Sequence, residues 1–242
     1  MKQWMIDEWC SVFKISGVQS NAYLVDTTDA CMLVDTGSFI VTRRIIPRID
    51  RILAGRKLTH LILTHTHYDH CFNAAAIIRE YGPEVVASVH DVEYALSGVT
   101  PLPAGTNKLS RYIARIAEAK FEPKIRYNPF HITTEVSKDV TLYSNRVTVD
   151  LLLTPGHTSG SLSVVVNNSV AMVGDTLFGI FPNSVYPPFA DNEKTMIQSW
   201  LKLLDTGCTV FLPGHGSAVD RRLLGKEVER YTQMTAADGK HW

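Results

Sequence analysis

Four apolar segments of this 242-residue chain each run directly into a histidine or an aspartate, and three of them have a glycine beside that residue. The four junctions are 58–65 (LTHLILTH), 151–157 (LLLTPGH), 170–175 (VAMVGD) and 210–215 (VFLPGH). Short apolar runs of this kind are typical of buried strands. Glycine permits the sharp turn and close backbone approach that a ligand at a strand end needs. The pattern therefore predicts strands whose ends carry metal-binding side chains.

The first junction has the densest group of polar side chains. Three imidazoles and one carboxylate occur within six residues, at His65, His67, Asp69 and His70. A regular strand or helix would point neighbouring side chains in different directions, but a tight strand-to-helix turn can aim them at adjacent points. Imidazole and carboxylate groups suit Zn²⁺, with Fe and Mn as alternatives. This spacing indicates a metal site and disfavours an ordinary polar surface turn.

The other apolar patterns predict an α/β protein. Strands are expected at 21–26, 31–35, 58–64, 85–89, 147–154, 162–166, 170–173 and 209–212. Helices are expected at 45–53, 73–81, 194–204 and 223–231. The first two strands should form a hairpin, and Pro47 indicates that the first helix begins close to it. We expect one domain, 1–242, with a helical insertion or lid at 97–138 that includes an amphipathic helix at Leu109–Phe121.

Composition narrows the partners and the compartment. The chain has 24 basic and 24 acidic residues, so it lacks the overall positive charge of many nucleic-acid and anionic-membrane binders. Its N-terminus has no apolar run of the signal-peptide type, and no stretch approaches the roughly 18 apolar residues of a membrane span. The four cysteines are scattered and form no CxxC pair, which favours reduced thiols. We expect a soluble cytoplasmic protein with neither a membrane nor a nucleic acid as its partner.

The order of the motifs resembles the metallo-β-lactamase superfamily. LVDTG, HTHYDH, PGHT, GDTLF and PGHG follow one another between Asn21 and Gly216, and GDTLF and PGHG look like the glyoxalase II and general metallo-hydrolase branch. The resemblance implies an αββα sandwich of two mixed β-sheets flanked by helices, with a binuclear site at one edge. It implies these ligand sets: His65, His67 and His157 for the first metal, Asp69, His70 and His215 for the second, and Asp175 bridging both. Asp35 of LVDTG would orient a ligand histidine by accepting its second N–H, or would only cap the turn before Gly37.

This resemblance implies a binuclear hydrolase that cleaves an ester-like bond, a thioester or a lactone, with a hydroxide bridging two divalent metal ions. Zinc is the expected metal. Asp69 is the candidate catalytic residue, since it could orient the nucleophile and shuttle its proton. Activity should fall below about pH 6 as protons compete for the ligand histidines. The segment Leu177–Phe189, rich in aromatics and proline, predicts a small-molecule substrate with an acyl or apolar portion, or else a homodimer contact.

Other functions stay open at this point. Leu177–Asp191 has no lysine or arginine and only 27 residues follow His215, which disfavours a glutathione thioester as substrate. A phosphodiesterase or nuclease would need a local basic groove, for which the candidates are Lys108, Arg111, Arg115, Lys120, Lys124 and Arg126. An iron-dependent enzyme like persulfide dioxygenase and a ligand-binding regulator are the remaining alternatives. Cys71 is expected to be a buried structural thiol, and His131 could reach the site only if the insertion is a lid.

Overall fold

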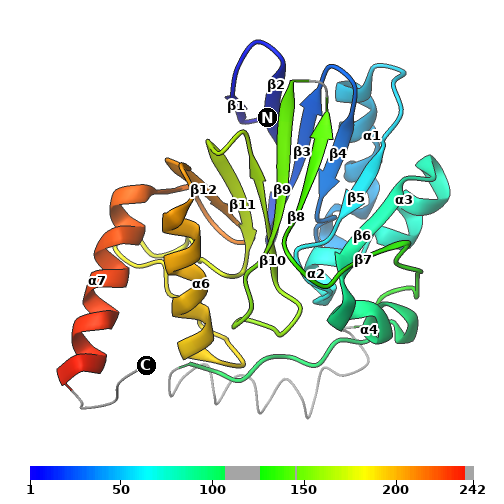
Figure 1. Ribbon diagram of the computed structural model, residues 1–242. Helices are drawn as coiled ribbons and strands as arrows, with labels where there is room; N and C mark the ends of the chain where they lie inside the picture. Colours follow the sequence, from blue (N-terminus) through cyan, green and yellow to red (C-terminus); the bar gives the residue numbers. More distant parts are fainter. Residues whose placement is uncertain (107–125, 145, 238–242) are drawn as a thin grey trace.

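The computed structural model describes residues 1–106, 126–144 and 146–237, and within them two β-sheets lie face to face (Figure 1). The first sheet has seven strands in chain order: β1 (Gln3–Met5), β2 (Cys10–Val18), β3 (Ser20–Thr27), β4 (Cys31–Val34), β5 (His60–Ile62), β6 (Glu84–Ser88) and β7 (Thr134–Val136). Its first four strands are antiparallel neighbours, whereas β4 to β7 run parallel. The sheet is therefore mixed.

The second sheet has six strands in the described residues, ordered β13-β12-β11-β10-β9-β8. They are β8 (Val140–Ser144), β9 (Val147–Leu153), β10 (Leu162–Val166), β11 (Val170–Gly174), β12 (Val210–Pro213) and β13 (Val219–Asp220). Only the pair β11 and β12 is parallel, and the other pairs are antiparallel. The turn between β10 and β11 has positive φ at Asn167 and Asn168, as a tight two-residue hairpin turn requires.

Helices cover the outer face of each sheet (Figure 1). The helical segments are η1 (Phe39–Val41), α1 (Thr42–Leu53), α2 (Tyr68–Cys71), α3 (Ala74–Tyr81), η2 (Val89–Asp91), α4 (Val92–Ser97), α6 (Glu193–Asp205) and α7 (Arg221–Ala237). Helices α1 and α3 pack on the first sheet, and α6 and α7 pack on the second. This order of layers confirms the expected αββα sandwich of two mixed β-sheets.

Three apolar clusters hold the layers together, one between the sheets and one beneath each helical layer. The middle cluster contains Val25 and Val34 of the first sheet and Val164 and Met172 of the second, all at most 2% exposed. Each fully buried side chain of this size contributes about 1.5–3 kcal/mol relative to an exposed one. The two sheets therefore form a rigid base for the loops at their edge.

The directions of the strands bring the polar junctions together. Strands β4 and β5 are parallel, so the segments that follow them leave the first sheet at the same edge. Strands β9 and β11 are both antiparallel to β10, and β12 is parallel to β11. The carboxyl ends of β9, β11 and β12 therefore also share one edge. A histidine or aspartate follows each of these ends within a few residues.

Several local predictions need correction. Helix α1 begins at Thr42, not near Pro47, which lies inside it. Pro47 has no N–H to donate to the carbonyl oxygen of Arg43, four residues earlier. Both residues are exposed, so this carbonyl lies on the solvent side of the helix. Thr134–Val136, expected in an insertion, form β7 of the first sheet.

Strands β1, β2, β8 and β13 were not predicted. In β2 the pairing register with β3 shifts between Lys14 and Ser16, which interrupts the alternation of buried and exposed residues. The amphipathic helix predicted at Leu109–Phe121 lies outside the described residues, and the role of 97–138 as a lid stays a prediction. No helix in the described part of the chain has both the length and the apolar character needed to cross a membrane.

Candidate metal centre

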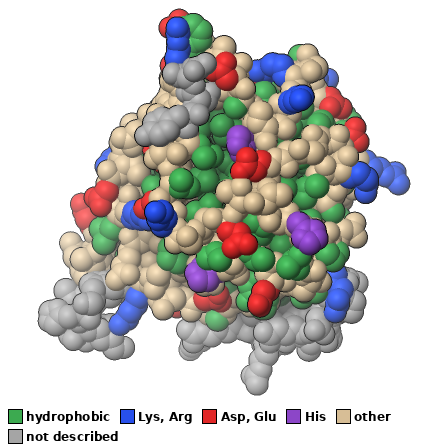
Figure 2. Space-filling model, turned by 45° about the vertical axis from the view of Figure 1, so that its right-hand side comes forward, with side chains coloured by type: hydrophobic (Ala, Val, Ile, Leu, Met, Phe, Trp, Pro, Cys, Tyr) green, Lys and Arg blue, Asp and Glu red, His purple; other side chains and the backbone are tan. Residues whose placement is uncertain are grey.

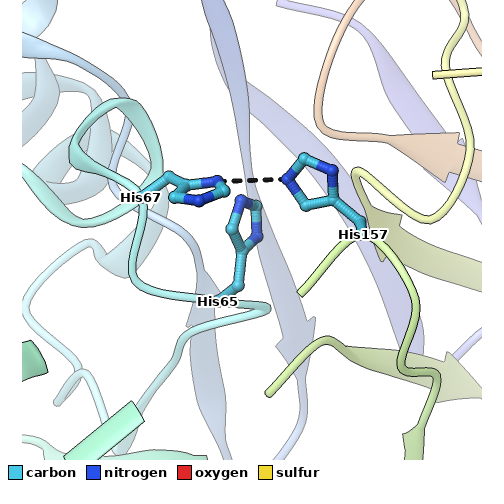
Figure 3. Close-up of side chains that lie close together, drawn as sticks. All are labelled: His65, His67 and His157. Carbon is cyan, nitrogen blue, oxygen red and sulfur yellow. Dashed lines mark hydrogen bonds between the residues drawn. The ribbon is translucent and has the colours of Figure 1, made fainter. Parts of the chain in front are cut away.

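The first group of converging side chains consists of His65, His67 and His157. His65 and His67 lie in the turn between β5 and α2, and His157 follows β9 (Figure 3). One nitrogen of each ring lies within 4.8 Å of the others, and all three residues are at most 4% exposed. Two residues that follow a strand of the first sheet therefore lie against one that follows a strand of the second.

Hydrogen bonds at the back of two rings fix which nitrogens face the centre. His67 Nε2 lies 3.1 Å from the carbonyl oxygen of Pro101, and His157 Nδ1 lies 2.9 Å from that of Phe189. A carbonyl only accepts, so each of these nitrogens carries an N–H, and the lowered pKa of both rings keeps them neutral. The other two nitrogens, His67 Nδ1 and His157 Nε2, then face each other with bare lone pairs at 3.1 Å (Figure 3). That arrangement needs a shared proton or a metal ion between the rings.

The second group consists of Asp69, His70 and His215, whose candidate ligand atoms also lie within 4.8 Å of one another. His215 Nε2 is 3.2 Å from Asp69 Oδ2, and His70 Nε2 is 3.9 Å from the same oxygen. His215 Nδ1 donates to the carbonyl oxygen of Gln19 at 2.7 Å. Both Nε2 atoms therefore point to the centre.

Asp175 lies between the two groups. Its Oδ1 is 3.3 Å from His70 Nε2, and its Oδ2 is 3.3 Å from His215 Nε2 and 3.7 Å from His157 Nε2. Asp175 also forms a third candidate group with His65 and His70. The structure therefore brings all seven predicted residues together, with Asp175 between the two groups.

Asp35 supports this centre from behind, as expected. The residue directly follows β4 with a φ of 58° and is 2% exposed. Its Oδ2 accepts from His70 Nδ1 at 2.8 Å. The backbone N–H and the hydroxyl of Thr64, each 2.8 Å away, hold the same carboxylate in place. The carboxylate thus fixes the tautomer of His70 and leaves its Nε2 for a metal.

The electrostatics differ between the two groups. Burial and the neighbouring imidazoles lower the pKa of His65 well below its usual value, and burial and His157 lower that of His67 to about 3. Burial also disfavours the charged form of His70 and His215, but Asp175 and the other carboxylates outweigh it. They raise the pKa of His70 well above its usual value and that of His215 to about 10. In the metal-free protein the carboxylates thus favour the protonated form of these two imidazoles, a positive charge that bound metal ions would replace.

The donor set and its unpaired atoms fit a pair of divalent ions. Five buried side-chain atoms of the described residues lack a hydrogen-bond partner, among them His65 Nε2, His70 Nε2 and Asp175 Oδ1, the last two facing each other at 3.3 Å. Unpaired buried polar atoms are costly, and three of them here belong to predicted ligands. Imidazole nitrogens with carboxylate oxygens suit zinc, iron or manganese.

One glycine shows how closely the backbone approaches the centre. A Cβ at Gly214 would lie 2.3 Å from Asp175 Oδ1 and 2.4 Å from His70 Cε1. The glycine of the motif PGHG is therefore required by space, because any side chain there would displace two candidate ligands.

Comparison with known proteins decides the family. The family model described as "Metallo-beta-lactamase superfamily" matches residues 15–215. The chain belongs to the metallo-beta-lactamase superfamily. Among its relatives, protein ML0493 of Mycobacterium leprae is 30% identical over 221 residues, which cover 85% of this chain and 90% of the relative. The probable metallo-hydrolase YqgX of Bacillus subtilis is 26% identical over 215 residues, which cover 85% and 89%.

Solved structures of the superfamily share the fold. The archaeal superfamily protein ST1585 from Sulfolobus tokodaii matches with a TM-score of 0.66 at 17% identity, covering 91% of this chain and 86% of that one. BJP-1, a subclass B3 metallo-beta-lactamase of Bradyrhizobium japonicum, matches with a TM-score of 0.66 at 16% identity, covering 98% and 93%. At such identities the likeness concerns the fold alone. The more specific resemblance to glyoxalase II stays a prediction.

Three further cysteine and histidine side chains of this superfamily member do not join the candidate ligand groups. Cys71 is fully buried and donates its S–H to the Thr66 carbonyl oxygen at 3.2 Å, and burial raises the pKa of its thiol well above the usual value. His131 is exposed, and His60 lies 3.6 Å from Glu84. None of these three belongs to a metal-binding group among the described residues.

The sequence did not reveal the backbone groups that orient the ligands. Gln19, Pro101 and Phe189 each contribute a carbonyl oxygen that accepts from a candidate ligand histidine. A backbone carbonyl is common to every residue type, so no pattern of residues could have identified these three positions. Only the packing of their loops against the histidines shows their role.

Proposed function

We propose that this protein is a hydrolase that uses two divalent metal ions, with zinc as the expected metal, to cleave an ester-like bond in a thioester or a lactone. The observation that carries the proposal is the convergence of seven candidate ligand residues, six of them buried. The far ring nitrogens of four of the histidines are held by other groups. Membership of the metallo-beta-lactamase superfamily supports a metal-dependent hydrolase, as do relatives named probable metallo-hydrolases.

Each residue has a defined part in this proposal. His65, His67 and His157 would hold one ion, and Asp69, His70 and His215 the other, with Asp175 between them. When bound, the ions would lower the pKa of a water molecule and polarise the substrate carbonyl. His70 Nδ1 donates its proton to a hydrogen bond with Asp35 Oδ2, and His157 Nδ1 donates to the Phe189 carbonyl oxygen, so both rings stay oriented.

Asp69 is the proposed catalytic residue. Burial opposes its ionised form, but His70 and His215 outweigh burial and lower the pKa of this carboxyl. The carboxylate is therefore ionised at neutral pH and can accept the proton of the attacking water. Asp69 Oδ2 lies 3.2 Å from His215 Nε2, within the second group.

An apolar wall beside His215 supports a substrate with an acyl or aromatic portion. The Phe178 ring centroid lies 5.0 Å from that of His215 and 6.2 Å from that of Phe181. Ile180 and Phe181 are 54% and 50% exposed, which leaves apolar surface beside the candidate ligand. A contact between two copies of the chain would use the same surface and is the competing explanation.

We further propose that the partner is a small molecule and not a nucleic acid. The charges of the chain balance. On the face shown in Figure 2, lysine and arginine side chains are dispersed among other residues and do not form one continuous patch. Of the six basic residues considered for a phosphate-binding groove, all but Arg126 lie outside the described residues. The balanced overall charge is what supports a small-molecule partner over a nuclease that tracks a phosphate backbone.

The first experiment measures metal content per chain on freshly purified protein and assays that sample on a thioester, a lactone, a β-lactam and a phosphodiester. Two zinc ions with metal-dependent thioester or lactone cleavage is the expected result. His157→Ala should lose metal and activity, whereas His131→Ala, at an exposed histidine away from the centre, should keep both. Turnover of phosphodiesters alone, iron with oxygen consumption, ligand binding without turnover, or no bound metal would each overturn the proposal.

A further inference from the structure

A cavity apart from the candidate metal ligands lies between the N-terminal residues, strand β2 and helix α1. Its volume is about 370 Å³, within the range of small-molecule sites. It is lined by Met1, Lys2, Lys14, Ile15, Ser16, Gly17, Arg48 and Arg51. Four of these residues are cationic, and none of the seven candidate metal ligands is among them.

The positive charge of this cavity, which we call the basic pocket, is not neutralised locally. None of its lining residues is acidic, and none of its four cations takes part in an ion pair within the described residues. Burial and the nearby Lys2 lower the pKa of Lys14. The charges of the whole chain balance, so the excess of positive charge belongs to this pocket and not to the chain as a whole.

Two of the cations are held in place and two are exposed. Arg48 Nη1 donates to the Ile15 carbonyl oxygen at 2.8 Å, and Lys14 Nζ donates to the Gly216 carbonyl oxygen at 3.2 Å. Lys2 and Arg51 are exposed at the rim, where Lys2 Nζ lies 4.9 Å from the centroid of the Trp4 ring. The fixed pair can define the position of a ligand, while the rim pair can close on it.

We propose that the basic pocket binds a doubly charged oxyanion, namely free phosphate or the phosphate group of a small phosphorylated molecule. Arginine forks match the oxygens of phosphate, and lysine adds compact charge. The apolar stems of these side chains, together with Ile15, leave room for an organic portion. The proposal does not depend on the hydrolysis proposed above.

The test titrates inorganic phosphate and phenyl phosphate into metal-loaded protein by isothermal calorimetry at constant ionic strength. Arg51→Gln is the main variant, because this rim residue is exposed and should not affect folding. Lys2→Gln is the second. Arg44→Gln is the matched control, an exposed arginine on the same helix that does not line the pocket. The metal content of each variant is measured as well. Phosphate that binds at the metal centre should bind equally to all variants with the same metal content, which distinguishes it from phosphate in the basic pocket.

We expect saturable phosphate binding that weakens about tenfold or more in Arg51→Gln and in Lys2→Gln, since each loses a charged hydrogen bond. Arg44→Gln should bind like the wild type. Binding of inorganic phosphate alone would assign the pocket to free phosphate, and equal or tighter binding of phenyl phosphate would assign it to a phosphorylated molecule. No saturable binding, or equal affinity in all variants, would overturn the proposal.

Discussion

Replacing Asp35 by asparagine tests whether this residue sets the tautomer of His70. The two side chains have nearly the same shape, and asparagine tolerates the positive φ of 58° at this position. The carboxylate accepts three hydrogen bonds of 2.8 Å, two from Thr64 and one from His70 Nδ1. An amide can keep the bond from the Thr64 N–H through its oxygen. Its NH₂ group would then face His70 Nδ1, where two donors cannot pair.

The expected loss of metal affinity follows from the position of the His70 proton. To accept from the amide, His70 must move its proton from Nδ1 to Nε2, the atom that faces Asp175 at 3.3 Å. A ring protonated at Nε2 cannot ligate a metal through that atom. The variant also loses a hydrogen bond to a charged acceptor, which contributes about 1.5–3 kcal/mol. The metal affinity should therefore fall about 10–100-fold, a loss typical of residues that orient a ligand.

Competition with a chelator of known affinity measures this change, and urea unfolding of the metal-free variant shows that the fold is kept. Asp150→Asn is the matched control, because this half-buried carboxylate on β9 accepts from Thr141 and does not touch the centre. It should bind metal like the wild type. A folded Asp35→Asn variant with unchanged zinc affinity would refute the reasoning.

Three further predictions follow from the geometry and the ionisation of buried groups. Gly214→Ala should lower the metal content because its Cβ would lie 2.3 Å from a candidate ligand oxygen. Gly225→Ala has open space around the new Cβ, so it should keep the metal and raise helix stability by about 0.5–1 kcal/mol. Equal metal content in both variants would contradict this prediction. The metal-free protein should be most stable near pH 6.5 in urea unfolding. Below pH 6.5 His67 takes up a proton in the unfolded chain but not in the folded protein, where its pKa is about 3. Above pH 6.5 His215 loses its proton in the unfolded chain but keeps it until about pH 10 in the folded protein. A flat profile of stability against pH would count against these shifts. Burial raises the pKa of Asp91 from 3.8 to about 6, so the folded protein loses stability as pH rises through that window. Asp91→Asn should therefore gain stability relative to wild type between about pH 4 and 6, and a constant difference would rule this out.

The ligand-bearing part of the molecule could be predicted from the sequence because its information is local. The turn at 65–70 carries four candidate ligands within six residues, and each of the other three follows a recognisable apolar strand. The apolar pattern and the length of those segments also predicted most of the strands of the second sheet. The predicted start of the first helix and the missed strand β2 show the limit, because a proline on an exposed face and a register shift disturb the patterns on which such predictions rest.

Only the tertiary structure decided which atoms of those residues face the centre. The carbonyl oxygens of Gln19, Pro101 and Phe189 select the nitrogen that each histidine presents, and they belong to loops far from their partners in the chain. The basic pocket likewise unites residues of the N-terminal segment, strand β2 and helix α1, whose lysines and arginines are separated in the sequence. Residue types determine what chemistry is available. Long-range packing sets the distances between groups, and electrostatic and hydrogen-bond energies depend on those distances.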